Sequence, residues 1–187
     1  MKEQIMAAAI PLFAKYGYRK TTIDDIAHAL RMAKGNIYHY FSNKEDLYHQ
    51  AVASVLDAWR GYVQEQVSDI VDPAERFRRM AEVAIEYPVS NLNFCNILLQ
   101  DPGIFSLSNR FDNYRPVNQP AEELLRGVIE SGIRAGVFRD APVEYTTELI
   151  FSIYMMHLIK IYGQGEGERG KEMYRCCIGL LLNGLCK

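Results

Sequence analysis

Apolar residues recur three and four positions apart along nearly the whole chain, and this spacing constrains the fold more than any other feature. One face of an α-helix collects residues at this spacing, whereas a half-buried strand alternates apolar and polar residues at every second position. The chain shows no sustained alternation of that second kind. We therefore expect an all-α fold.

The N-terminal segment predicts short helices with recognisable ends. A helix over 2–16 should bend at Pro11, which lacks a backbone N–H, and should end at Gly17. A second helix should begin after Thr22, because Thr22 and Asp25 resemble a capping box. These signals place the second helix close behind the first.

A third, short helix is expected over 33–41. Its buried side would consist of Ala33, Ile37 and Phe41, which are four residues apart. The residues turned outward or to the flanks are polar, aromatic and basic: Lys34, Gly35, Asn36, Tyr38 and His39. Two short helices joined by a tight turn, the second about 12 Å long at about 1.5 Å per residue, suit the major groove of DNA. The pattern predicts a helix-turn-helix over about 21–44.

The start of this third helix carries the first candidate DNA contacts. Lys34 can meet a phosphate or a guanine, and Asn36 can hydrogen-bond to a base edge or a phosphate. Gly35 lets the backbone approach the DNA closely, and the positive end of the helix dipole lies on the same side.

Three further residues extend this candidate surface. Tyr38 and His39 offer phosphate contacts or packing on a thymine methyl group, and Lys44 is placed to hold the DNA backbone. Each has an ordinary structural explanation when taken alone, since lysines are usually solvated and tyrosines often pack. Their joint spacing favours nucleic-acid binding.

The rest of the chain predicts a longer helical domain. A fourth helix should run from 43 to about 71, opened by a capping box of Ser42 and Glu45 and ended by Asp72-Pro73. Further helices are expected over 74–86, 92–100, 119–135, 142–163 and 169–186. We expect a helix-turn-helix DNA-binding domain over 1–47 and a helical effector-binding and dimerisation domain over 48–187, with the fourth helix shared between them.

Charge is distributed unevenly between these two parts. The whole chain carries a formal net charge of −2. Up to Gln50 there are seven Lys or Arg and five Asp or Glu, so this part is +2 and the remainder is −4. A small basic head on an acidic body is compatible with DNA binding through a local patch.

A series of N-terminal positions agrees, in order and without gaps, with one known pattern. It reads Ile5-x-x-Ala8-Ala9-x-x-Leu12-Phe13, Gly17-Tyr18, Thr21-Thr22-Ile23-x-Asp25-Ile26-Ala27, Lys34-Gly35-Asn36-Ile37-Tyr38-His39-Tyr40-Phe41 and Lys44-Glu45-x-Leu47. These residues resemble the DNA-binding domain of the TetR family of transcriptional regulators. Beyond them, only the helical layout and a Gly136-Val137-Phe138-Arg139 turn are similar to the family.

The resemblance implies a homodimeric regulator, usually a repressor, that binds a palindromic operator in double-stranded DNA. It implies that a small molecule binds the C-terminal domain and releases the DNA. The DNA contacts carried over by position are Thr22, Lys34, Gly35, Asn36, Tyr38, His39, Tyr40 and Lys44.

Three positions depart from the family pattern. Arg31 stands in the turn where glycine is usual, and a positive φ there would cost on the order of 1 kcal/mol. Ala33 replaces the usual Ser or Thr cap, which weakens that helix end by roughly 1 kcal/mol. Asn36 replaces a commoner Thr or Ala, which leaves the operator sequence open.

The last two expected helices are the most apolar. In isolation they predict core, and in the family such a pair forms a four-helix interface with its two-fold mate. Two-fold symmetry would then set the two recognition helices about 34 Å apart, one turn of DNA.

A ligand pocket is expected between the middle helices. Its candidate lining residues are Phe94, Leu98, Phe105, Tyr114, Tyr154, Met155 and His157. Since His157 is the one ionisable residue that stands out within an apolar run, we expect an uncharged or aromatic, hydrophobic effector. Effector binding would tilt the fourth helix and move the DNA-binding heads out of register with the grooves.

Other functions find less support. The chain carries no nucleophile elbow, phosphate-binding glycine loop or HExxH motif, so we expect no enzyme, no catalytic residues and no cofactor. The cysteines form no CxxC pair, so we expect no metal site, although a thiol-based sensor using Cys176 and Cys177, or Cys95, stays open. An activator or architectural protein without an effector also stays open. Without an apolar run long enough to span a bilayer, we expect a cytoplasmic protein with no membrane partner.

Overall fold

The computed structural model describes residues 1–101, 104 and 115–187, and its regular elements within these ranges are all helices. They are α1 (Lys2–Lys20), α2 (Ile23–Ala29), α3 (Lys34–Tyr38), α4 (Lys44–Val67), α5 (Pro73–Ser90), α6 (Leu92–Gln100), α7 (Arg115–Arg134), α8 (Val143–Leu158), the π-helical turn η2 (Ile159–Gly163) and α9 (Gly167–Leu185). The predicted all-α fold is confirmed. No helix of these described ranges is long and apolar enough to cross a bilayer.

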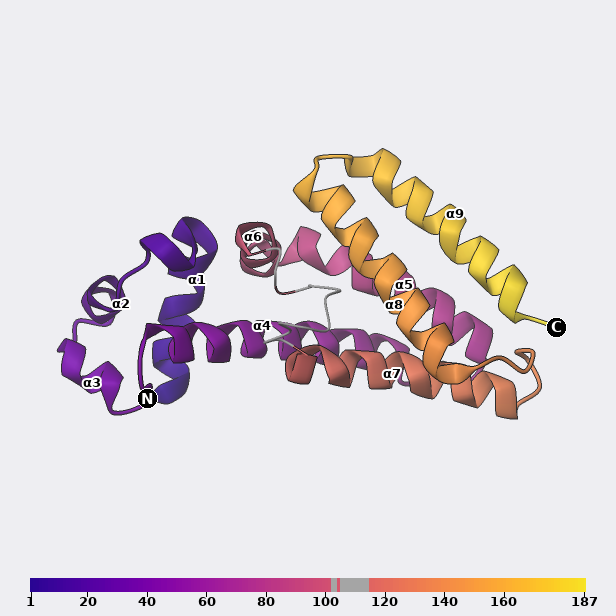
Figure 1. Ribbon diagram of the computed structural model, residues 1–187, viewed down its shortest axis with the longest axis horizontal. Coiled ribbons are helices and arrows are strands. Elements are labelled where there is room, and N and C mark those ends of the chain that lie inside the picture. The colour runs from indigo at the N-terminus through magenta and orange to yellow at the C-terminus, as the bar shows by residue number, and fades with distance from the viewer. Residues whose placement is uncertain (102–103, 105–114) are drawn as a thin grey trace.

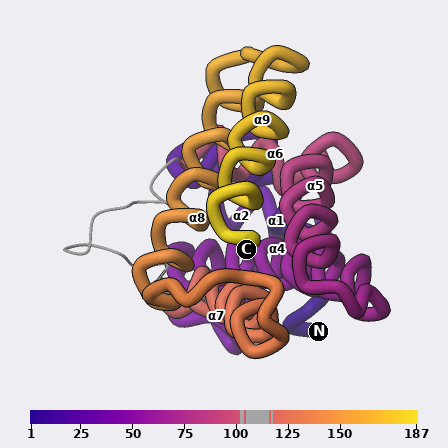
Figure 2. The backbone as a smooth tube through the Cα atoms, turned by 90° about the vertical axis from the view of Figure 1, so that its right-hand side faces the viewer, coloured from indigo at the N-terminus to yellow at the C-terminus, as the bar shows by residue number. Residues whose placement is uncertain are grey.

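The molecule is elongated, with a small head at one end and a larger body at the other (Figure 1). The head consists of α1, α2 and α3, and α4 runs from it along the length of the body. In the body, α5 and α7 pack against the far part of α4, α8 packs on α7 and α9 packs on α5, while α6 lies between head and body. In the end-on view α8 and α9 lie side by side and project from the rest (Figure 2).

The first helix is interrupted at Gly17, where the sequence predicts its end. Gly17 has φ +77°, which breaks the helical path before the last residues of α1, so the predicted stop at this glycine is confirmed although a further turn extends to Lys20. Gly17 is also buried. A Cβ there would lie 3.0 Å from Oε1 of Gln100, so α6 approaches α1 at a residue that has no side chain.

Of the two predicted capping boxes, the one at α2 is present and the one at α4 is not. The capping box at α2 is confirmed, since the Thr22 side chain accepts from the Asp25 backbone N–H and the Asp25 side chain accepts from the Thr22 backbone N–H. The predicted box of Ser42 and Glu45 is wrong. Asn43 caps α4 instead, because its side chain accepts from the backbone N–H of Asp46 at 2.8 Å.

Several helix bounds also differ from the prediction. The fourth helix ends at Val67 and not near 71, and Asp72 caps α5 with Pro73 as its first residue. The helix expected over 142–163 is α-helical to Leu158, where the wider π-helical turn η2 begins. Such turns leave a local irregularity in hydrogen bonding that apolar spacing does not report.

One residue of the turn between α2 and α3 is under backbone strain. Arg31 has φ +53° and is the one non-glycine residue with positive φ among the described residues. We expect Arg31→Gly to raise the free energy of unfolding by up to about 1 kcal/mol, because glycine adopts this conformation without the Cβ penalty. Chemical denaturation of both proteins measures the difference.

Ala7→Gly serves as the control, since Ala7 is exposed within the regular part of α1. It should lower the free energy of unfolding by about 1 kcal/mol. If Arg31→Gly lowered the free energy of unfolding as much as Ala7→Gly does, Arg31 would not be strained.

Candidate nucleic-acid interface and effector cavity

The third helix, Lys34–Tyr38, is shorter than the predicted 33–41, and Ile37 within it and Phe41 after it hold this segment against the head. Ile37 and Phe41 are buried in the core of the head, as predicted. Ala33 is exposed, so its predicted burial is wrong. The reason is its position: Ala33 is the N-cap residue with extended φ and ψ of −71° and 141°, and it therefore does not share the face that α-helical spacing gives to Ile37. As predicted from its residue type, it supplies no side-chain cap.

Polar and aromatic residues remain on the outside of α3 and of the two residues that follow it. We call this surface the α3 strip, and it comprises Lys34, Gly35, Asn36, Tyr38, His39 and Tyr40, all of them exposed. The Tyr38 and Tyr40 side chains are 47% and 44% exposed. A Cβ on Gly35 would meet nothing within 4 Å, so the fold itself does not require glycine there.

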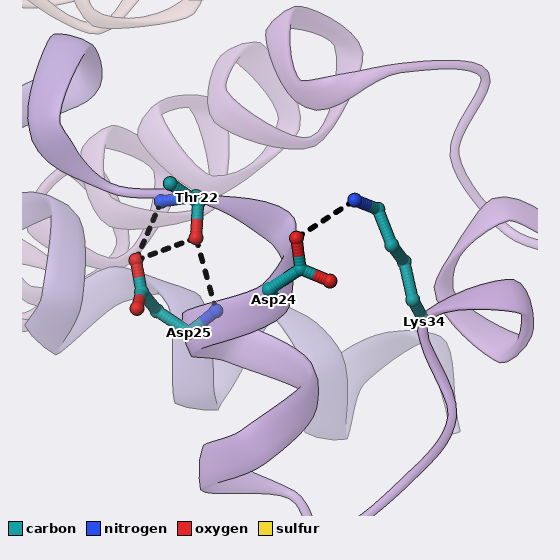
Figure 3. A network of polar contacts seen from close by, with 4 residues as sticks. All are labelled: Thr22, Asp24, Asp25 and Lys34. Atoms are coloured by element: carbon teal, nitrogen blue, oxygen red, sulfur yellow. Dashed lines mark hydrogen bonds and ion pairs between the residues drawn. The ribbon is translucent and has the colours of Figure 1, made fainter.

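Two aspartates at the start of α2 have different partners (Figure 3). Asp25 stays within the cap, where the Thr22 hydroxyl donates to it at 2.7 Å, and this hydrogen bond lowers the pKa of Asp25. Asp24 instead accepts from Nζ of Lys34 at 2.8 Å, and this contact raises the pKa of Lys34. The lysine is 47% exposed and the aspartate 68%, so solvent can replace either partner.

Lys44 has a structural role that the sequence did not reveal. Its ammonium donates to the backbone carbonyls of Tyr18 at 2.8 Å and Thr21 at 3.1 Å, and it lies 4.3 Å from the centroid of the Tyr18 ring. It therefore caps the carbonyl end of α1 and ties α4 to it.

An apolar cavity lies in the body between α4, α5, α7, α8 and α9. Its volume is about 50 Å³. Its lining is apolar or aromatic except for Arg60: Trp59, Arg60, Val63, Phe77, Met80, Ala81, Ala84, Ala121, Leu124, Leu125, Ile150, Phe151, Tyr154, Tyr174 and Ile178. The Trp59 and Tyr154 rings stack at 5.5 Å with 9° between their planes, and they form one wall.

The predicted ligand residues are distributed around this cavity. Tyr154 lines it, while Phe94 lies behind the wall with its ring 6.0 Å from that of Trp59. His157 is buried with its ring 5.3 Å from Tyr174, another lining residue, and Met155 is buried nearby in sequence. Phe105 and Tyr114 lie outside the described residues. Sequence reasoning missed Trp59 and Arg60, whose apolar neighbours on α4 were the available signal.

Leu98 lines a second pocket, between α6 and η2. This pocket has a volume of about 220 Å³ and is lined by Cys95, Leu98, Leu99, Leu158, Ile159, Tyr162, Gly163 and Gln164. Burial raises the pKa of Cys95, and it likewise raises the pKa of Cys177. A raised pKa reduces the fraction of thiolate, which is the reactive form of cysteine, so burial lowers the reactivity of both thiols.

A continuous series of contacts leads from the cavity to the head. Trp59 in the cavity wall stacks against Phe94 on α6. The C-terminal end of α6 reaches α1 at Gly17 through Gln100, and Tyr48 of α4 donates to Asp101 at 3.0 Å. A change in the cavity wall can therefore reach the head through α6 as well as through α4.

The last two helices each have two apolar faces. The inner faces, with Ile150, Tyr154 and Ile178 among others, belong to the core. The outer faces are a stripe at Tyr145, Leu149, Ser152 and Met156 on α8 and at Ile159 of η2, and a stripe on α9 at Met173, Cys177, Leu180 and Gly184. Successive residues of both stripes are alternately four and three positions apart, which is the spacing of apolar residues in helices that pack in bundles.

Two family models match the chain. Residues 5–51 match the model described as bacterial regulatory proteins, tetR family, and residues 71–157 match the model described as tetracyclin repressor-like, C-terminal domain.

Curated relatives and solved structures agree with these models. The chain is 28% identical to the transcriptional repressor KstR2 of Rhodococcus jostii over 144 residues, covering 76% of the chain and 71% of the relative. It is 26% identical to the transcriptional regulator RutR of Escherichia coli over 156 residues, covering 82% and 70%. The crystal structure of the regulator FadR of Bacillus subtilis in complex with stearoyl-CoA has a TM-score of 0.80 at 18% identity, covering 98% of the chain and 99% of that structure.

The structural role of Lys44 can be separated from DNA contact. We expect Lys44→Met to lower the free energy of unfolding by about 1–3 kcal/mol, because two carbonyls lose a charged donor while the apolar stem is kept. Lys34→Met should leave stability within about 0.5 kcal/mol, since its ion pair is exposed. Denaturant titration of both variants tests this, and equal stabilities would remove the capping role.

Proposed function

Because the chain belongs to the TetR family of transcriptional regulators, we propose that it represses transcription as a homodimer, binds a palindromic operator and is released by a small hydrophobic effector. As a member of this family it is a DNA-binding regulator with a ligand-binding C-terminal domain, and not an enzyme. DNA binding, the dimer and the effector are each supported by particular residues of this chain.

The observation that carries the proposal is the α3 strip. Its donors and rings have no partners in the core, and two of its members are exposed aromatic residues. Gly35 has open space where a side chain would be, which suits close approach of a DNA backbone. We propose that the α3 strip contacts DNA together with Thr22 beside it. Lys44 contributes through the N–H group of its ammonium that is not used by the carbonyls of Tyr18 and Thr21.

The Asp24–Lys34 pair sets the strength of this contact. A phosphate that approaches Lys34 must replace or share the Asp24 carboxylate, whose negative charge also repels the DNA. Asp24 therefore reduces affinity for every DNA sequence alike. This preserves selectivity, because base contacts must then supply a larger share of the binding free energy.

The dimer is proposed from the outer stripes of α8 and α9. Tyr145, Leu149 and Leu180 are 72%, 56% and 67% exposed, so the stripes present large apolar side chains to solvent. Such a patch is characteristic of a protein interface. Its four-and-three spacing suits a four-helix bundle with the same two helices of a second copy, an interface that two-fold symmetry repeats.

The effector is proposed to bind in the body at the apolar cavity. Ligand pockets usually enclose about 300–1,000 Å³, so the present 50 Å³ requires the wall to open. The FadR protein of Bacillus subtilis, which has a similar fold, was crystallised in complex with stearoyl-CoA. We propose a largely apolar effector that separates the stacked Trp59 and Tyr154 rings.

Release of DNA follows from the position of these rings. Trp59 belongs to α4, which also supplies Leu47 to the core of the head, and its ring contacts Phe94 on α6. Displacing Trp59 would shift α4 and α6 against α1. An effector achieves this only if it binds the shifted conformation more tightly than the DNA-bound one. The domain division at residue 47 then serves as a functional boundary inside a continuous helix.

DNA binding is tested by fluorescence anisotropy on the DNA upstream of the gene across a salt series. Lys34→Ala and Tyr38→Ala should weaken binding roughly tenfold or more, and Lys34→Ala should reduce the salt slope by about one. Asp24→Asn should strengthen binding several-fold on operator and random DNA alike.

Lys171→Ala is the matched control, since Lys171 pairs with Glu168 at 2.7 Å in the body, far along the chain from α3. It should bind as the unaltered protein does. If neither the upstream DNA nor selected DNA is bound better than random sequence, the repressor proposal fails.

The dimer is tested by light scattering after size-exclusion chromatography. Leu180→Glu should yield a monomer with much weaker operator binding, because a carboxylate cannot be buried unpaired in the interface. Val71→Glu introduces the same charge at a residue that is 90% exposed and outside both stripes, and should remain dimeric. A dimeric Leu180→Glu protein would contradict this interface.

A further inference from the structure

Arg60 is an unusual member of the cavity lining. It is the one charged side chain among residues that are otherwise apolar or aromatic. Its Nε is buried and has no hydrogen-bond partner, and it is the one buried side-chain nitrogen or oxygen so found within the described residues. A buried donor without an acceptor is costly, so its retention in a cavity wall calls for an explanation.

The other end of the same guanidinium is held in place. Nη2 of Arg60 lies 3.2 Å from the Asp57 carboxylate, one turn earlier on α4. Asp57 is 57% exposed and Arg60 is 32% exposed, so the pair lies at the edge of the cavity with its outer part in water. The carboxylate fixes the group and balances its charge. An incoming acceptor at Nε therefore does not need a full negative charge.

We propose that Arg60 anchors the effector, and that the effector is an acyl compound. Its carbonyl or carboxylate oxygen accepts a hydrogen bond from Nε, and its hydrocarbon part enters the cavity behind Arg60. This inference rests on the proposed function, because it assigns a ligand class to the proposed effector site. A hydrogen bond from a charged donor to such an oxygen is stronger than a neutral one, so Arg60 also selects for the head group.

The chain provides its own probe for this binding. Trp59 is its single tryptophan and adjoins Arg60 in the cavity wall. An alkyl chain of the ligand that separates the stacked rings of Trp59 and Tyr154 should change the tryptophan fluorescence. The compounds to titrate are decanoate, decanoyl-CoA and decylammonium, which share an alkyl chain and differ in the head group.

The variants are Arg60→Met, Arg60→Gln and the control Arg79→Met. Methionine keeps the apolar stem of arginine without its donors, and glutamine serves if the first variant folds poorly. Arg79 is a partly exposed arginine outside the cavity lining, 3.7 Å from Glu82. Operator binding by each variant, measured beforehand, shows that it is folded.

We expect decanoate or decanoyl-CoA to bind the unaltered protein and Arg79→Met equally. Both Arg60 variants should bind the same compound about tenfold or more weakly, and decylammonium should bind weakly throughout. Binding of decanoate alone identifies a free acid as the source, and binding of decanoyl-CoA alone identifies a thioester.

Equal acyl binding by Arg60→Met and the unaltered protein would overturn the inference. So would decylammonium binding as tightly as decanoate, or the absence of any fluorescence change with both acyl compounds. In each of these cases the repressor proposal survives if the unaltered protein still binds its operator. Loss of operator binding by the unaltered protein would instead defeat the proposed function.

Discussion

The buried face of α4 holds the two halves of the molecule together. Leu47 and Ala51 near its start are fully buried with the head, and Trp59 and Val63 further along are buried in the body. Because one continuous helix supplies both cores, the head has no flexible linker behind it. Its position is set by how side chains pack along α4, and any rearrangement in the body moves the same rigid element.

The second connection, between α6 and α1, is made differently. It depends on a glycine at close approach and on polar contacts at the end of α6, whereas α4 relies on apolar burial. Close packing with few rotatable groups favours discrete arrangements over gradual deformation. The ring stack of Tyr154, Trp59 and Phe94 reaches both connections, so a small cavity can influence a distant surface.

Local signals in the sequence predicted much of the head. Gly17 breaks the first helix and Thr22 caps α2 as expected, because each signal depends on neighbours a few residues away. The positive φ of Arg31 was expected only from the family resemblance, in which glycine is usual at that position. The cap of α4 was misassigned because Ser42 and Asn43 are both good N-caps and each has an acidic residue three positions later. Only the backbone path distinguishes them.

Features built from distant segments could not be predicted in this way. The pairing of Lys34 with Asp24 joins two helices across the turn, and Lys44 reaches carbonyls more than twenty residues earlier. The cavity draws on five helices, so its lining on α4 follows only from their packing. The spacing of apolar residues predicted that α8 and α9 are apolar. It did not predict that each helix has an inner face in the core and an outer face exposed to solvent.

The central claim is that two copies of the α3 strip, related by a two-fold axis, read DNA. Selection of bound duplexes from a randomised pool tests it most directly, with Lys34→Ala selected in parallel. We predict enrichment of an inverted repeat whose half-sites are about one helical turn apart, and no enrichment with the variant. Enrichment of a single asymmetric site, or equal enrichment by both proteins, would contradict it.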